Sequence, residues 1–449
     1  MPTLLRRPAV VLTAGCVVLL IGMGLRNSFA LFLTPVTEHL HWTREEFSLG
    51  LAVQLLVWGL AQPFAGALAD RYGSGRVVLF GGLSYALGIG LAAQAYEPAH
   101  FGLTVGCMGG MGLGAAGFAV VLAAMARAVP PAKRSFAMGL GTAAGSAGQF
   151  LLVPVTHVFL HVHGWANAYL FLAVAAALMI PAAAGLSGRP EPVAGDWPRQ
   201  SVGGAIVEAL RHRGFVLLMA GYFVCGFQLA FITNHLPAYL TDHGLADTLG
   251  VLALSAVGLF NIAGCLWFGA LGGRRSRKKL LAAIYASRAA LIALFVVVPL
   301  DTATVLVFAA GMGFTWLSTV PLTTGLVEQI FGPRYLATLG GLVFCTHQIG
   351  SFLGVWLGGL LYDETGSYLA VWWAACVLSA LSAIVHLRID DRPVVRSPED
   401  SSRGSPPWTS TGRGCSASPM SGTACRRPAQ FPCRRPPAGS AGPRRGHRR

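Results

Sequence analysis

The chain has 449 residues, of which 54% are hydrophobic and only 11% are charged. This composition is too apolar for a water-soluble domain of this length and excludes a soluble globular enzyme or binding domain. The formal net charge of +15 would suit a nucleic-acid-binding protein, so its distribution along the chain decides what it means.

Apolar runs recur up to about residue 388, many of them near the ~20 residues that cross ~30 Å of hydrocarbon. They predict an all-α membrane protein with twelve transmembrane helices. In chain order we expect spans at 9–33, 45–69, 77–96, 101–126, 135–160, 166–187, 215–240, 246–272, 280–299, 302–330, 335–361 and 367–388. The first span follows two arginines, as in a signal peptide, but no small-residue cleavage site follows, so we expect it to be retained.

Basic residues gather in alternate loops between these spans. They are Arg6, Arg7, Arg71, Arg76, Arg127, Lys133, Arg134, Arg189, Arg199, Arg211, Arg213, Arg274, Arg275, Arg277, Lys278, Lys279 and Arg334. The opposite loops hold only Arg44. The positive-inside rule therefore predicts a multi-pass protein of the inner (plasma) membrane with both termini in the cytoplasm. The positive charge reflects topology and predicts no nucleic-acid partner.

The chain repeats itself about 200 residues apart. Gly66–Leu68 at the end of span 2 matches Gly269–Leu271 at the end of span 8. The pattern predicts two parallel six-helix bundles at 1–187 and 214–388, a cytoplasmic linker at 188–213 and a disordered basic tail at 389–449. The tail either contacts anionic lipid or is dispensable. We expect a monomer whose solute site lies between the halves near the bilayer midplane.

A short motif at the end of span 2 combines a glycine turn with one carboxylate and two cations. It contains Gly66, Asp70, Arg71, Gly73 and Arg76. This motif resembles the loop signature of the major facilitator superfamily, and the resemblance covers residues 9 to 388. It implies that these residues latch the two halves on the cytoplasmic side, with Gly66 allowing close helix approach. The alternative is that Asp70 only caps a helix.

A second resemblance concerns the branch within that superfamily. The stretch from Arg26 to Leu33, followed by Trp42-Thr43-Arg44, is similar to spans 1 and 2 of monocarboxylate transporters and oxalate:formate antiporters. In those relatives an arginine in span 8 holds the substrate carboxylate, whereas this chain has Asn261 and Cys265 there. A span 11 lysine of the oxalate exchangers is also missing, and the middle of this span holds His347 and Gln348.

Polar groups inside spans are candidates for the solute site because a charge at mid-depth costs several kcal/mol. The predicted substrate-binding residues are Arg26, Asn27, Gln149, Gln228, Asn234, Asn261, His347 and Gln348. Arg26 lies near the outer leaflet, where it could also snorkel to the interface. His347 could carry a proton. The amides could instead join helices, and Arg288 in span 9 is expected to bond backbone or a neighbouring helix rather than substrate.

Three histidines near the end of span 5 have spacing that could bind a metal, since His157 and His161 share a helix face. No cysteine or carboxylate lies close to His157, His161 and His163 in the sequence. We therefore expect a wet interfacial cluster and no metal or other cofactor.

The function that these patterns favour is secondary active transport by alternating access. The solute is expected to be a small organic anion such as a monocarboxylate, moved by proton symport or anion exchange. The alternative is a proton-coupled exporter of drug-like or hydrophobic solutes. None of the three lysines lies in a phosphate-binding loop, and no span carries paired catalytic groups, so we expect neither an ATP-driven pump nor an enzyme.

Overall fold

The computed structural model describes residues 7–130, 133–187, 201–332 and 335–394, and these contain helices and connections but no strand. The helical elements are α2 (Pro8–Ser28), η1 (Phe29–Phe32), α3 (Leu33–Leu40), α4 (Arg44–Tyr72), α5 (Ser74–Ala92), α6 (Pro98–Phe101), η2 (Gly102–Met108), α7 (Gly109–Ala116), α8 (Phe118–Arg127), α9 (Arg134–Ala177), α10 (Met179–Gly185), α11 (Val202–Arg211), α12 (Arg213–Asp242), α13 (Asp247–Gly272), α14 (Arg277–Val297), α15 (Thr302–Thr315), α16 (Thr319–Phe331), α17 (Leu336–Thr365) and α18 (Leu369–Leu387).

Eleven helical segments of the described chain are long and apolar enough to cross a membrane. The longest, Phe136–Gly185, has 50 residues, which at 1.5 Å per residue would be ~75 Å long and far exceeds a bilayer. Gly164 divides it, because its φ of 77° and ψ of 170° are not helical. The segment therefore contains the predicted fifth and sixth spans, and the prediction of an all-α membrane protein is confirmed.

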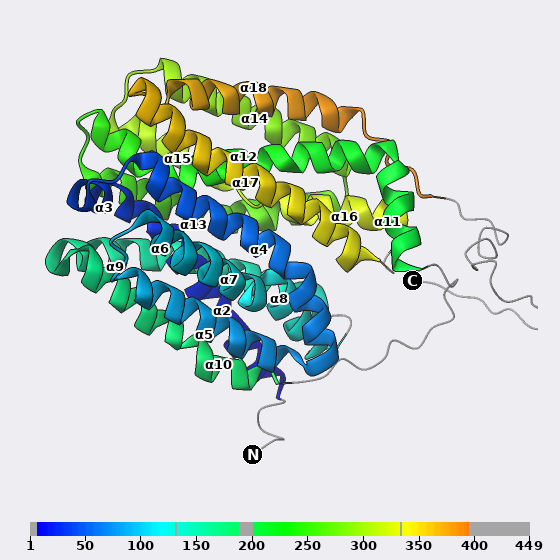
Figure 1. Ribbon diagram of the computed structural model, residues 1–449. Coiled ribbons are helices and arrows are strands. Elements are labelled where there is room, and N and C mark those ends of the chain that lie inside the picture. Colours follow the sequence, from blue (N-terminus) through cyan, green and yellow to red (C-terminus); the bar gives the residue numbers. More distant parts are fainter. Residues whose placement is uncertain (1–6, 131–132, 188–200, 333–334, 395–449) are drawn as a thin grey trace, which may run out of the picture. The chain divides into compact units, whose positions relative to one another are not determined.

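Two clusters of buried apolar side chains form the interior. One consists mainly of residues from α2 to α10, and the other of residues from α11 to α18 and the segment after it. Figure 1 shows the corresponding blue-to-teal and green-to-orange helices as two groups. The described residues nevertheless belong to a single compact unit, Met1–Gly404. The boundaries of two bundles, a linker and a tail therefore stay a prediction. Residues 188–200 of the linker and 395–449 of the tail lie outside the described residues, whereas α11 lies within the second part of the expected linker.

The two halves meet along two pairs of long helices. Helix α4 packs against α17, and α9 packs against α13. The contact is close enough that a Cβ on Gly59 of α4 would lie 2.6 Å from Gln348 of α17. These pairs place polar side chains from both halves around a common space.

Candidate functional site

A cavity of about 170 Å³ lies between the halves. It is lined by Met23, Arg26, Asn27, Trp58, Gln62, Phe118, Leu122, Thr142, Gly145, Ser146, Gln149, Tyr222, Leu229, Ala230, Thr233, Asn261, Trp316, Leu317, Val320, Phe344, His347, Gln348 and Ser351. These residues come from α2, α4, α8, α9, α12, α13, α16, α17 and the break between α15 and α16. An apolar cavity of about 150 Å³ is known to bind benzene. The cavity therefore suits a solute of a few heavy atoms.

Arg26 supplies the positive charge of this cavity. It lies in the last turn of α2, where the chain tightens into the 3₁₀ segment η1. Its Nη1 donates to Asn27 Oδ1 at 3.3 Å, and its guanidinium carbon lies 5.4 Å from the Trp58 ring centroid. Its Nε is buried without a hydrogen-bond partner, and within the described ranges no carboxylate forms an ion pair with it. A cation in a cavity with an unused donor is suited to hold an anion.

His347 and Gln348 connect α17 to α4 at the cavity wall. Gln348 Nε2 donates to the Leu55 carbonyl oxygen at 3.0 Å, which leaves its Oε1 facing His347 Nδ1 at 2.9 Å. Since an amide oxygen only accepts, neutral His347 carries its hydrogen on Nδ1. The imidazole packs against Phe344, with a ring separation of 5.7 Å. Nε2 of His347 is then the nitrogen that can accept a further proton.

Gln149 and Asn261 line the cavity and also join α9 to α13. Gln149 Nε2 donates to the Leu254 carbonyl at 2.9 Å, and Asn261 Nδ2 donates to Ser146 Oγ at 2.8 Å. Asn261 Oδ1 accepts from the backbone N–H of Leu317 at 2.9 Å, in the short turn between α15 and α16. These two amides therefore join helices, which was the alternative to substrate binding in the sequence analysis. They also line the cavity.

Two predicted substrate-binding residues lie outside the cavity lining, contrary to expectation. Gln228 donates to the Ala375 carbonyl of α18 at 2.7 Å, and Asn234 donates to the Ala230 carbonyl of its own helix at 2.7 Å. The cavity-facing residues of α12 include Leu229 and Thr233. Gln228 and Asn234 are each one residue away from these, which turns their side chains by ~100° around the helix.

Arg288 takes the backbone role expected for it. It is fully buried, and its Nη2 donates to the carbonyl oxygens of Thr315 at 2.5 Å and Trp316 at 2.7 Å. These carbonyls lie where α15 ends, so the guanidinium stabilises a break that brings Trp316 to the cavity. Arg288 itself is not a lining residue. Trp58, which also lines the cavity, was not predicted, because aromatic residues are common throughout membrane spans.

The two halves are tied together at the end of the molecule where α4 begins, here called the closed end. Arg44 forms two hydrogen bonds to the Asp242 carboxylate, at 2.6 and 2.7 Å. The Asp363 carboxylate accepts the backbone N–H groups of Arg44 and Glu45, the first residues of α4, at 3.1 and 2.6 Å. Trp356 Nε1 donates to Glu45 Oε1 at 2.9 Å. These contacts combine helix capping with charge pairing and close this end.

The predicted latch lies at the other end of α4. Gly73 has φ 94° and joins α4 to α5, as the glycine turn requires, and Arg71 and Arg76 are exposed. The side chain of Asp70 lies outside the described residues. Among the described residues, no heavy atom lies within 4 Å of the position that a Cβ on Gly66 would take, so the expected close helix approach is not seen there. Gly269, its repeat counterpart, has the same open space, and the latch stays a prediction.

The fold and the cavity define a multi-pass membrane protein with a small chamber between its halves that both apolar and polar side chains line. The sequence matches the family model described as Major Facilitator Superfamily over residues 14–355, and the chain belongs to this family of transporters.

Curated relatives fall in the same family. The chain is 25% identical to the uncharacterized MFS-type transporter YcxA of Bacillus subtilis, over 82% of this chain and 91% of the relative. It is 27% identical to monocarboxylate transporter 11 of Mus musculus, over 78% of this chain and 80% of the relative. It is 24% identical to the oxalate:formate antiporter of Oxalobacter formigenes, over 81% and 85%. These relatives include both transporter types that the sequence resembles.

Proposed function

We propose that this chain carries small monocarboxylates across the inner membrane by alternating access, with Arg26 holding the carboxylate. The observation that carries the proposal is the cavity-lining guanidinium of Arg26, whose buried Nε has no partner. Asn27 and the Trp58 ring hold this group in place. A carboxylate would supply the acceptor and the countercharge that no described side chain gives to Arg26.

The size of the cavity and the relatives support the same substrate class. A volume of about 170 Å³ suits an acid of a few heavy atoms better than a drug-sized molecule, since pockets for drug-sized ligands are about 300–1,000 Å³. Monocarboxylate and oxalate:formate carriers are among the relatives. An exporter of hydrophobic solutes would gain nothing from the uncompensated charge of Arg26.

The contacts at the closed end support an assignment of the side of the membrane from which the solute reaches the cavity. With both termini in the cytoplasm, the Arg44–Asp242 pair lies outside and the solute reaches the cavity from inside. The conformation is then the inward-facing state of the cycle. Opening to the outside requires that Arg44 leave Asp242 and that α4 separate from Asp363.

Coupling to protons or to a second anion is the remaining part of the proposal. His347 borders the cavity, and its Nδ1 faces Gln348 Oε1 at 2.9 Å. Its Nε2 can take up a proton close to the bound carboxylate, and this would link proton and substrate movement. Exchange needs no such group, because one anion can replace another on Arg26.

Proton flux into liposomes tests the proposal. The full chain is reconstituted in vesicles holding a pH dye, and lactate, pyruvate, formate and oxalate are added in turn. Faster acidification than in empty vesicles, lost in Arg26→Gln, supports proton-linked uptake. Lumenal formate exchanging for external labelled oxalate without acidification supports anion exchange. If folded protein moves none of these acids in either assay, the proposal is wrong.

A further inference from the structure

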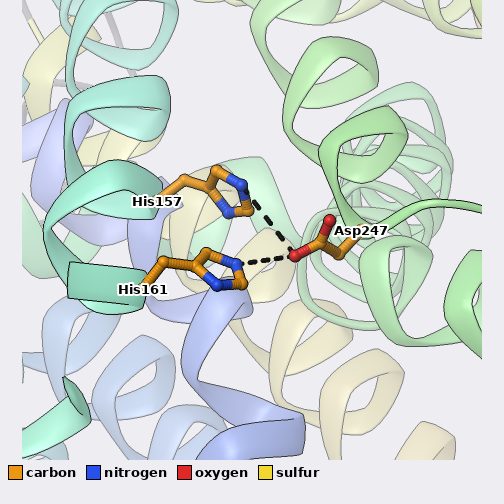
Figure 2. Close-up of side chains that lie close together, drawn as sticks. All are labelled: His157, His161 and Asp247. Carbon is orange, nitrogen blue, oxygen red and sulfur yellow. Dashed lines mark ion pairs between the residues drawn. The ribbon is translucent and has the colours of Figure 1, made fainter.

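Two histidines of one half and one aspartate of the other meet at the closed end. His157 and His161 lie on α9, and Asp247 is the first residue of α13. His161 Nε2 lies 2.6 Å and His157 Nε2 lies 3.9 Å from the same oxygen, Asp247 Oδ2. Figure 2 shows both rings directed at this carboxylate. The expectation that no carboxylate joins these histidines is therefore wrong, because Asp247 comes from a distant part of the chain.

The local structure fixes the directions of these ligands. The i, i+4 spacing places the two histidines on one face of α9, where their rings meet edge to face with centroids 4.3 Å apart. Asp247 Oδ1 accepts the backbone N–H of Thr248 at 2.7 Å at the start of α13. This bond leaves Oδ2 for the histidines. The bond to the Thr248 N–H therefore orients the carboxylate independently of its contacts with the imidazoles.

The donor set and spacing fit a zinc-like cation. One ligand atom from each of the three side chains lies within 4.8 Å of the others. Zn²⁺ binds histidine nitrogen and carboxylate oxygen at ~2.0–2.2 Å in tetrahedral geometry, which places ligand atoms ~3.4 Å apart. The observed 3.9 and 2.6 Å lie on either side of this value, so small side-chain shifts suffice. His161 and Asp247 are 58% and 47% exposed, so water can complete the coordination.

We propose that His157, His161 and Asp247 form a divalent metal site for Zn²⁺ that ties the two halves together at the closed end. The ligands come from both α9 and α13, so a bound metal opposes the separation of these helices. This effect on turnover rests on the proposed transport function: metal at this end slows the cycle by holding the carrier closed there. Metal binding itself requires no assumption about the solute.

Calorimetric titration of the tag-free full chain with Zn²⁺ tests the site. Wild type is expected to bind one zinc that is lost or weakened at least ~10-fold in His157→Ala/His161→Ala. Asp247→Asn should weaken it by a similar factor, because this change removes the ligand from the other half. His163→Ala is the matched control, since this histidine of the same helix stacks on Phe159 with a ring separation of 4.3 Å. Co²⁺ should give the visible absorption of a tetrahedral site in wild type and the control only.

Transport measurements then test whether bound zinc slows the cycle by holding the closed end together. Zn²⁺ should slow acid uptake by wild type and leave Asp247→Asn at its own metal-free rate, and chelation should restore the wild-type rate. Absence of zinc binding, or equal binding by Asp247→Asn, overturns the site. Zinc binding through Asp247 with unchanged acid uptake overturns the proposal that bound zinc slows the transport cycle. If no acid is transported at all, the proposed function fails while the titration still decides the metal site.

Discussion

Replacing Arg26 by glutamine should weaken carboxylate binding without disturbing the fold. Glutamine keeps a polar side chain beside Asn27 and Trp58 but removes the charge and the Nε donor that has no partner in the cavity. The variant therefore tests the cation that lines the cavity and forms no ion pair with a described carboxylate. Arg26→Lys restores the charge without the planar pair of donors.

The magnitude follows from the contacts that Arg26 can offer. Its Nη1 bond to Asn27 is long, at 3.3 Å, so a carboxylate would gain at least one charge-assisted hydrogen bond at Nε. Hydrogen bonds to charged groups contribute ~1.5–3 kcal/mol, which corresponds to a ~10- to 150-fold change in Kd. Arg26→Lys should lose less than Arg26→Gln, because the ammonium still attracts the anion.

Binding is measured by calorimetry on purified protein with lactate and with its uncharged analogue lactamide. Arg26→Gln should raise the Kd for lactate and leave lactamide binding unaltered. Arg213→Gln removes an exposed arginine that does not line the cavity, and it should behave as wild type. Lactate binding of wild-type strength in Arg26→Gln would refute the assignment of Arg26 as the carboxylate group.

Three further predictions concern the scaffold around the site. Gly226→Ala should lower the Tm because its Cβ would overlap the His347 carbonyl oxygen, an overpacking that costs ~1–3 kcal/mol. Gly340→Ala, where the space is open, is the matched control, and equal melting of the two would contradict the packing argument. A double-mutant cycle of Arg44→Gln and Asp242→Asn, read by thermal unfolding, should give a coupling of ~0.2–1 kcal/mol, since both side chains are partly exposed; additive effects would mean that the pair contributes nothing. Burial raises the pKa of Asp391, but its bond to Lys278 and the charge of this lysine outweigh that and hold the pKa below the usual 3.8. The pair therefore stabilises the fold fully above the unfolded-state pKa and loses this effect as pH falls through the lower folded-state pKa. The Tm difference between wild type and Asp391→Asn should shrink below about pH 4, and a difference that persists in acid would argue against the pair.

The membrane spans could be predicted closely from the sequence. The expected span 246–272 appears as Asp247–Gly272, and the expected span 302–330 appears as Thr302–Phe331. This works because the requirement is local: a segment must be long and apolar enough to cross the hydrocarbon, whatever packs beside it. The division between the fifth and sixth spans could also be predicted from the sequence, since Gly164 and the polar residues before it interrupt the apolar run.

The polar residues that line the cavity could be predicted only in part. Arg26, Asn27, Gln149, Asn261, His347 and Gln348 all line the cavity, whereas Gln228 and Asn234 do not. The cost of a buried polar group shows that it needs a partner but does not say which one. In a membrane helix both the lipid face and the packed face are apolar, so no hydrophobic stripe shows how the helix is turned.

By itself the sequence determined the number and order of the helices, the repeat and the family signature, because these depend on residues close together in the chain. Only the tertiary structure decided that Leu229 and not Gln228 faces the cavity, that no described carboxylate pairs with Arg26, and that Asp247 meets His157 and His161. These results depend on the rotation of each helix and on contacts between distant segments. Both are set by the packing of the two halves, which no local pattern records.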